Sequence, residues 1–299
     1  MRFGVVGTGH WATTIHAAGL AAHPEAELVG IWGRDLAKAE AAAAAHGAEG
    51  FDDYSAFLEA VDAVSFAVPP AVQVPAALGA AAKGRPLLLE KPIATSLEQA
   101  DALVEAAADV ASVVFFTSRF VPAWEDWLDT MARRSLLGGE IHWLSSLDTP
   151  GNPFADSPWR RDFGALWDVG PHALSLLLPM LGPVVDIAGA RGHRDLVHLV
   201  LTHEGGAAST VSLSLTMPPT AQRWEVSVYD EAGWHPQPDD PRDVAACYAT
   251  AVSELVDAAT TGVPHRCDVR FGRDVVKVLA RAEAVLSPGL TPPSASPTG

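Results

Sequence analysis

The sequence opens with short apolar runs separated by longer stretches rich in helix-forming residues. The apolar runs predict strands at residues 3–6, 27–32, 48–51, 61–68, 86–89 and 110–116. The intervening stretches predict helices at residues 10–22, 35–46 and 71–83, and a further helix capped by Ser96, with Gln99 completing a capping box. Strands that alternate with helices in this way predict a doubly wound parallel sheet with right-handed crossovers.

Beyond residue 120 the hydrophobic pattern changes. A helix is expected at residues 120–134, followed by strand-like stretches at residues 141–147, 184–190, 196–202, 209–217 and 223–229. Within residues 209–217, apolar residues alternate with Ser212, Ser214 and Thr216, so one face packs on a core and the other is small and polar. A run of such strands predicts a mainly antiparallel open sheet, followed by helices at residues 243–260 and 272–285.

These patterns divide the chain into two domains and a tail. Residues 1–118 form the α/β domain and residues 119–286 the α+β domain, whose final helix can pack back on the first. Residues 287–299 are rich in proline and serine, and we expect them to be disordered. At 299 residues the chain is long enough for each domain to bury its own core.

Composition narrows the possible partners. The formal net charge of −16 argues against nucleic acid and anionic membrane surfaces, although a local pocket can still hold an anionic cofactor. No apolar run approaches the roughly 20 residues that a membrane span needs. Cys247 and Cys267 match no metal spacing, so we expect no metal site and no disulfide. Because the first strand starts at residue 2, we expect no signal peptide and a cytoplasmic location.

The first turn of the chain carries a candidate nucleotide-binding motif. Residues 7–12, GTGHWA, fit the pattern G-x-G-x-x-A between a strand and a helix. Gly7 permits the tight turn, Gly9 allows the backbone to approach a pyrophosphate, and Ala12 lets the helix pack on the strand. The helix N-terminus then offers free N–H groups to phosphate, so this segment predicts dinucleotide binding.

The end of the second strand bears on which dinucleotide binds. The strand ends in Trp32-Gly33-Arg34-Asp35, without a carboxylate at the first position, where NAD-binding domains use one to hold the ribose hydroxyl. Arg34 is placed to receive the 2′-phosphate of NADP. Asp35 keeps NAD as an alternative, although it can also cap the helix that follows.

The fifth predicted strand ends in a charged tripeptide, Glu90-Lys91-Pro92. In a parallel sheet, ligands bind outside the carboxyl ends of the strands, so a lysine fixed there can face whatever the glycine turn holds. A half-buried lysine loses its charge more readily than a solvated one, which suits it to proton transfer. Taken alone, the tripeptide is equally compatible with a surface lysine that leaves a strand.

A second candidate lies in residues 164–175, GALWDVGPHALS. Asp168 and His172 are four apart, and the glycine and proline between them suggest that a helix begins at Pro171. Asp168 then lies close enough to orient the imidazole as an acid or base near neutral pH. The alternative interpretation is a capping aspartate and a structural histidine. The remaining histidines, His16 among them, show no ligand spacing and are interpreted as surface or packing residues.

Together these motifs resemble one family. The G-x-G-x-x-A start, the E-K-P after the fifth parallel strand and the later D-x-G-x-H are similar to the Gfo/Idh/MocA oxidoreductases, named for glucose-fructose oxidoreductase and inositol dehydrogenase. The likeness runs from residue 2 to residue 178, including Ser118-Arg119-Phe120 and Trp159-Arg160, and returns at residues 268–285. It implies a Rossmann domain followed by a mainly antiparallel sheet domain, with the active site between them.

The resemblance also implies hydride transfer between C4 of a nicotinamide and a carbon bearing a hydroxyl or carbonyl. Lys91, Asp168 and His172 match the family's catalytic positions. Lys91 and His172 would share carbonyl polarisation and proton transfer, in an order left open, and Asp168 would orient and tune them. The residues expected to bind the cofactor are Gly7, Thr8, Gly9, His10, Trp11, Ala12, Gly33, Arg34, Pro69, Glu90 and Lys91. The residues expected to contact the substrate are Lys91, Arg119, Trp159, Arg160 and His172.

Two departures from the family pattern are visible. Relatives often carry a histidine in the helix after the fourth strand, where this chain has Gln73, and we expect altered substrate contacts there rather than lost chemistry. The chain also passes quickly from residue 234 to residue 243, where relatives usually add strands, which leaves the second sheet's size open. The polar face around Ser212 and Ser214 could pair with another subunit to form a homo-oligomer, or it could simply be exposed to solvent.

The leading hypothesis is an NADP-dependent oxidoreductase acting on a sugar, a cyclic polyol or a similar small alcohol or ketone. Within that class, the alternatives are NAD use and a dihydrodiol or imine substrate. From other classes, a dinucleotide-binding regulator that has lost catalysis, or a structural domain without a cofactor, would share the fold. The complete set of Lys91, Asp168 and His172 favours the enzyme.

Overall fold

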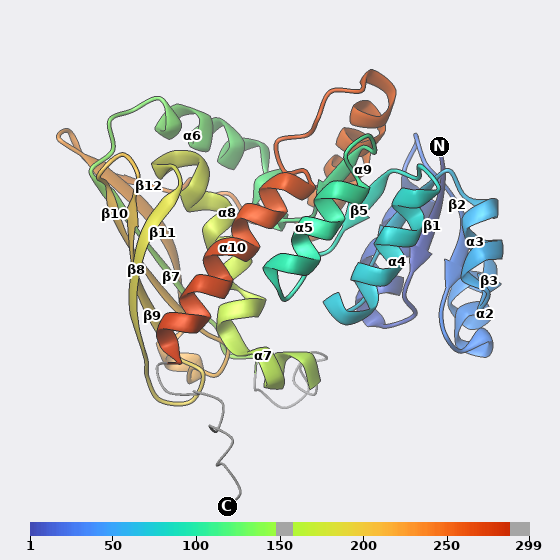
Figure 1. The fold of residues 1–299 in the computed structure, drawn as a ribbon, viewed down its shortest axis with the longest axis horizontal. Helices are drawn as coiled ribbons and strands as arrows, with labels where there is room; N and C mark the ends of the chain where they lie inside the picture. Colours follow the sequence, from blue (N-terminus) through green and yellow to red (C-terminus); the bar gives the residue numbers. More distant parts are fainter. Residues whose placement is uncertain (148–157, 288–299) are drawn as a thin grey trace, which may run out of the picture.

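The computed structural model describes residues 1–147 and 158–287. Within them the chain builds two six-stranded sheets that lie side by side, each packed against helices (Figure 1). The tail that we expect to be disordered lies, from residue 288 on, outside the described residues. Among the helices in the described ranges, none combines the length and the apolar character that crossing a membrane requires.

The first sheet is parallel throughout, with the strand order β3-β2-β1-β4-β5-β6, which confirms the predicted doubly wound sheet. Its strands are β1 (Arg2–Val6), β2 (Glu27–Trp32), β3 (Glu49–Phe51), β4 (Ala63–Phe66), β5 (Leu87–Leu89) and β6 (Ser112–Val114). Every residue of β4, β5 and the edge strand β6 is buried, because helices pack against these strands. Such burial explains why their sequences are nearly continuous apolar runs.

The helices that connect these strands follow the predicted alternation, except that one has a π-helical segment and one was not predicted. They are η1 (Ala12–Ala17), α1 (Ala18–Ala22), α2 (Leu36–Ala44), α3 (Tyr54–Ala60), α4 (Pro70–Ala82) and α5 (Leu97–Ala106). The predicted helix at residues 10–22 has a π-helical centre, η1. Helix α3 was not predicted; Asp53 caps it by accepting from the N–H groups of Ser55 and Ala56.

The capping box predicted at α5 is only half formed. Ser96 accepts a hydrogen bond from the backbone N–H of Gln99, as a capping residue does. The side-chain Oε1 of Gln99 is buried and has no hydrogen-bond partner among the described residues. The reciprocal bond of the box is therefore missing.

The second sheet has the strand order β12-β11-β7-β10-β9-β8. Its strands are β7 (Gly138–Leu144), β8 (Val184–Arg191), β9 (Val197–His203), β10 (Ala208–Ser214), β11 (Arg223–Asp230) and the unpredicted β12 (Gly233–Pro236). The pair β7 and β10 is parallel and the other pairs are antiparallel, so the mainly antiparallel character is confirmed.

The small polar face expected on β10 is engaged within the chain itself. Ser212 Oγ lies 2.9 Å from His198 Nδ1, and the hydroxyl of Ser214 donates to Asp195 Oδ1 at 2.7 Å. Both serines are buried, which differs from an open polar surface. Pairing of this sheet with another subunit stays a prediction.

The last helix of the chain packs against both sheets, whereas the helix before it packs mainly on the first. The helical elements of the second half are η2 (Thr117–Phe120), α6 (Pro122–Ala132), α7 (Pro158–Asp168), α8 (Gly170–Leu181), η3 (Pro219–Ala221), α9 (Val244–Thr261) and α10 (Val269–Leu286). Helix α9 packs against η1, α1, β5 and β6 of the first sheet as well as η2. Helix α10, red in Figure 1, runs between the sheets and contacts α5 and β6 on one side and α8 and β8 on the other. The domain boundary after residue 118 stays a prediction.

Candidate active site

The glycine turn after β1 has a backbone that only glycine can adopt at its first position. Gly7 has φ of +132°, and a Cβ there would lie 2.6 Å from the carbonyl oxygen of Ala67. A Cβ on Gly9 would meet no protein atom within 4 Å, and Gly9 and His10 are exposed. Ala12 is buried against the core. The turn therefore leaves open space beside Gly9, which fits the close approach of a pyrophosphate.

The loop after β2 touches this turn. A Cβ on Gly33 would lie 2.6 Å from Thr8 Cγ2, so the two loops pack directly on each other. Arg34 is exposed at the loop. Asp35 caps α2, because its Oδ1 accepts from the N–H of Lys38 at 3.2 Å, and Lys38 Nζ lies 3.7 Å from its Oδ2. The Asp35 carboxylate is thus engaged at the start of the helix.

Glu90 joins the glycine turn to Lys91. The indole Nε1–H of Trp11 donates to Glu90 Oε1 at 2.7 Å. The other carboxylate oxygen, Oε2, accepts from the backbone N–H of Lys91 at 3.2 Å. Glu90 therefore fixes the position of Lys91 relative to the glycine turn.

Behind Glu90 lies a buried hydrogen-bond chain that the sequence did not indicate. His16 is fully buried in η1; its Nε2 lies 3.2 Å from Glu90 Oε1 and its Nδ1 lies 2.8 Å from Ser65 Oγ. Ser65 Oγ lies 2.8 Å from the hydroxyl of Tyr248 in α9, and burial raises the pKa of that phenol. Interpretation of His16 as a surface or packing residue was therefore incomplete, because a π-helical turn breaks the periodicity used to assign faces.

Gln73 holds the backbone around Lys91 from the other side. Its Oε1 accepts from the N–H of Glu90 at 2.9 Å, and its Nε2 donates to the Glu90 carbonyl at 2.8 Å. The same Nε2 lies within 3.4 Å of the carbonyl oxygens of Pro92 and Ile93. Gln73 is fully buried in α4, whose N-cap is Pro69. The Gln73 amide is thus engaged by backbone groups, and altered substrate contacts at this position stay a prediction.

Lys91 and Asp168 form a buried ion pair between the two halves of the chain. Lys91 Nζ donates to the carbonyl oxygen of Asp168 at 2.7 Å and to its Oδ1 at 3.0 Å. Arg160 Nε donates to the other carboxylate oxygen, Oδ2, at 2.7 Å. Burial alone would raise the pKa of the Asp168 carboxyl, but the charges of Lys91 and Arg160 and their hydrogen bonds lower it to about 2. Asp168 is therefore ionised throughout the neutral range.

His172 lies near this pair in α8, which begins at Gly170, one residue earlier than predicted. Its imidazole stacks on the Trp143 ring, with centroids 5.2 Å apart and an interplanar angle of 17°. Both carboxylate oxygens of Asp168 are bonded to Lys91 and Arg160, and His172 Nδ1 is buried without a hydrogen-bond partner among the described residues. The expectation that Asp168 orients the imidazole by direct bonding is therefore corrected.

The electrostatic surroundings keep His172 neutral. Burial lowers the pKa of His172 well below its usual value, and the positive charges of Lys91 and Arg242 lower it further, against the opposing effect of Asp168. A neutral imidazole at neutral pH can accept a proton. Stacking on Trp143, rather than a carboxylate, holds the ring in place.

Arg119 is bonded to other elements of the chain. Arg119 is buried; its Nε donates to Glu125 Oε1 at 2.6 Å and its Nη1 to the Ser175 carbonyl at 3.0 Å. Its guanidinium thus joins η2, α6 and α8, and contact of Arg119 with the substrate stays a prediction. Trp159 is half-buried in α7, beside Arg160, and stacks on Phe163 with centroids 5.3 Å apart.

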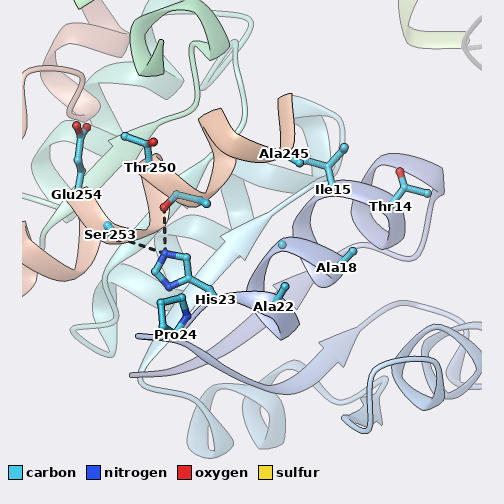
Figure 2. A pocket seen from close by; sticks show the side chains of 12 residues that line it. Thr14, Ile15, Ala18, Ala22, His23, Pro24, Ala245, Thr250, Ser253 and Glu254 are labelled. Carbon is cyan, nitrogen blue, oxygen red and sulfur yellow. Dashed lines mark hydrogen bonds between the residues drawn. The ribbon is translucent and has the colours of Figure 1, made fainter. Parts of the chain in front are cut away.

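A cavity of about 530 Å³ lies elsewhere, between the first helix and α9 (Figure 2). Its walls include Ile15, Ala18 and Ala22 on one side and Ser253 and Glu254 on the other. His23 Nε2 is already bonded there, 3.1 Å from the Ala249 carbonyl oxygen and 3.2 Å from Ser253 Oγ. None of the candidate catalytic residues lines this cavity, which is a groove between two packed helices.

Comparison with known proteins identifies the family of this chain. Residues 1–118 match the model of an oxidoreductase family with an NAD-binding Rossmann fold, and residues 135–233 match the GFO/IDH/MocA C-terminal domain. The chain is 30% identical over 247 residues to dTDP-3,4-didehydro-2,6-dideoxy-alpha-D-glucose 3-reductase of Streptomyces antibioticus, covering 78% of this chain and 74% of that one.

Solved structures share the same fold. UDP-N-acetylglucosamine 3-dehydrogenase of Acidithiobacillus ferrooxidans superposes with a TM-score of 0.80 at 23% identity, covering 96% of this chain and 97% of that one. The WlbA dehydrogenase of Bordetella pertussis, in complex with NADH and UDP-GlcNAcA, has a TM-score of 0.81 at 21% identity, covering 95% and 96%. Because the two family matches together span most of the chain, the protein belongs to the Gfo/Idh/MocA family and is an oxidoreductase with an NAD-binding Rossmann domain.

Proposed function

We propose that this oxidoreductase transfers a hydride between NADP(H) and a carbinol or carbonyl carbon of a sugar or related polyol. The observation that carries this proposal is the Lys91–Asp168 ion pair, held next to the glycine turn through Glu90 and Trp11. Two relatives support a sugar substrate, since their names specify a reductase and a dehydrogenase at position 3 of a hexose. A ring hydroxyl or ketone at that position is our first choice.

The residues of the first domain fit a bound dinucleotide. Gly7 and Gly9 leave the space that a pyrophosphate needs, and Arg34 is exposed where the 2′-phosphate of NADP would lie. Asp35 is used as a helix cap, which favours NADP over NAD because a capping carboxylate is less available to the ribose hydroxyl groups. The bound nicotinamide would supply or accept the hydride. NAD is the alternative, and it would require Asp35 to leave its capping position.

Lys91 and His172 have complementary roles in this proposal. The two bonds of Lys91 Nζ to Asp168 leave one further N–H donor of the ammonium for the reacting oxygen of the substrate. The ionised Asp168 fixes that ammonium in place. His172, neutral because of its burial and neighbouring charges, accepts the hydroxyl proton during oxidation and returns it during reduction.

The cofactor assignment is tested by titrating the protein with NADPH and NADH, following energy transfer from tryptophan to the nicotinamide. We expect NADPH to bind more tightly, and Arg34→Ala to weaken NADPH about tenfold or more while leaving NADH unchanged, since a charge-assisted contact is lost. If NADH bound more tightly than NADPH, the proposed cofactor would be NAD instead of NADP. If the protein bound neither dinucleotide, the proposed hydride transfer would be contradicted and a structural role without a cofactor would be favoured.

The catalytic assignment is tested with Lys91→Met and a panel of hexoses, hexose phosphates and nucleotide sugars, monitored by nicotinamide absorbance. We expect kcat to fall by about 10²- to 10⁴-fold while the dinucleotide still binds. Lys83→Met is the matched control, because Lys83 pairs with Glu59 on an exposed surface. A kcat of Lys91→Met close to that of the wild-type protein would contradict the proposed mechanism.

A further inference from the structure

Arg242 lies in an aromatic setting next to the candidate active site. It belongs to the short segment between β12 and α9, and its guanidinium carbon is 4.1 Å from the centroid of the Trp224 ring and 4.9 Å from that of Trp143. Trp143 is the same ring on which His172 stacks. Through Trp143, Arg242 is therefore an immediate neighbour of the His172 side of the site.

The guanidinium of Arg242 has few partners. Within the described part of the chain, its one hydrogen bond runs from Nη1 to Ser118 Oγ at 3.4 Å, and it forms no ion pair. The adjacent Asp243 is engaged as the N-cap of α9, where its Oδ1 accepts from the N–H groups of Ala245 and Ala246. Burial lowers the pKa of Arg242, as expected for a desolvated cation without a carboxylate beside it.

Two other arginines near the site differ from the half-buried Arg242, because each of them forms an ion pair. Arg119 is bonded to Glu125 and Arg160 to Asp168. A charge that is largely removed from water is unfavourable unless an opposite charge accompanies it. Two aromatic faces compensate part of this penalty but leave the N–H edge of the guanidinium available. In a chain of net charge −16, such an unpaired cation is an anomaly that a bound anion would resolve.

We propose that Arg242 binds an anionic oxygen group of the substrate, a carboxylate or a phosphate, while the reacting carbon lies between Lys91 and His172. This inference rests on the proposed function and specifies its substrate class as an acidic or phosphorylated sugar. The planar guanidinium matches the paired oxygens of either group, and the Trp143 and Trp224 rings hold it in one orientation. The positive charge of Arg242 near His172 also supports the neutral imidazole.

The experiment measures binding of three probes to the protein saturated with oxidised dinucleotide: D-glucuronate, D-glucose 6-phosphate and D-glucose, by calorimetry. We expect at least one charged probe to bind about tenfold to a hundredfold more tightly than glucose, as a hydrogen-bonded charge pair implies. Arg242→Gln should abolish that advantage, and Arg242→Lys should retain part of it. The probe with the larger advantage distinguishes a carboxylate site from a phosphate site.

The matched control is Arg133→Gln, which removes an exposed arginine that has no ion pair among the described residues and should keep the full preference. The inference is wrong if wild-type protein binds charged probes no more tightly than glucose, or if Arg242→Gln weakens all three probes equally. Titration of each variant with the dinucleotide distinguishes failure of the Arg242 inference from failure of the proposed function on which it rests. Normal dinucleotide binding together with a lost charge preference supports both proposals. Normal dinucleotide binding with an unchanged preference in Arg242→Gln overturns this inference alone, and failure of wild-type protein to bind dinucleotide overturns both.

Discussion

Trp11 donates its indole N–H to Oε1 of Glu90 at 2.7 Å, across 79 positions of the sequence. This bond joins the glycine turn to the segment that carries Lys91, whose backbone N–H is bonded to the other oxygen of the same carboxylate. The two motifs that predict nucleotide binding and proton transfer are thus parts of one hydrogen-bonded unit. One carboxylate therefore holds the turn and the Lys91 backbone together.

We predict that Trp11→Phe destabilises this unit. The substitution keeps the aromatic packing but removes a hydrogen bond to a charged group, so the free energy of unfolding should fall by about 1.5 to 3 kcal/mol. Dinucleotide affinity should also fall, because the turn loses its link to Glu90. Urea unfolding followed by circular dichroism, together with a titration by NADPH, measures both effects.

Trp234→Phe is the matched control for this change. Trp234 is exposed in β12, and its indole N–H has no described hydrogen bond. Its replacement should change the free energy of unfolding by less than about 0.5 kcal/mol. Equal losses in the two variants would show that the bond to Glu90 contributes nothing specific.

Gln73→Leu should be among the most destabilising single substitutions in the first domain. The backbone N–H and carbonyl of Glu90 both depend on the Gln73 amide, and leaving two buried polar groups unsatisfied costs about 2 to 6 kcal/mol. We expect kcat to fall as well, because Lys91 follows directly. Urea unfolding and steady-state kinetics of the same preparation provide the measurement.

Gln99→Leu offers a matched comparison on the neighbouring helix. The Oε1 of Gln99 is buried without a partner among the described residues, so replacing it by an apolar group should cost less than about 1 kcal/mol or even stabilise the protein. If Gln99→Leu proved as damaging as Gln73→Leu, the clamp around Glu90 would not explain the loss.

The Asp168 ion pair predicts a specific loss of stability in acid. The pKa of Asp168 is about 2 in the folded protein against an ordinary value of 3.8, so the unfolded chain binds the proton more readily as the pH falls. Its contribution, about 2 to 3 kcal/mol, is fully present above about pH 4 and is lost as the pH falls towards 2. We expect the free energy of unfolding of wild-type protein to fall more steeply over this range than that of Asp168→Asn.

Urea unfolding at a series of pH values between about 2 and 7 tests this linkage. Asp109→Asn is the control, because Asp109 is exposed and has no ion pair among the described residues. It should follow the wild-type pH dependence. Parallel curves for wild-type protein and Asp168→Asn would contradict the assignment.

Most of the architecture could be predicted from local patterns. The alternation of apolar strands and helices predicted the parallel sheet, because buried central strands such as β5 are apolar throughout. The elements α3, β12 and α7 were not predicted. A seven-residue helix and a four-residue strand leave too little periodicity, and Gly164, with a φ of +63°, interrupts the helical backbone of α7. The glycine pattern at residues 7–12 was predictable because the turn after the first strand has a positive φ at Gly7, which glycine adopts far more readily than other residues.

The sequence by itself determined the fold class and the glycine turn, because these depend on local periodicity and motif order. It identified Lys91, Asp168 and His172 as candidate residues through the family resemblance that these motifs carry. Only the tertiary structure decided which side chains those residues meet. Asp168 bonds to Lys91 and Arg160, and Gln73 bonds to backbone; both outcomes depend on contacts between distant segments. Such contacts depend on how the helices and sheets pack in three dimensions, and spacing along the chain carries no direct record of that packing.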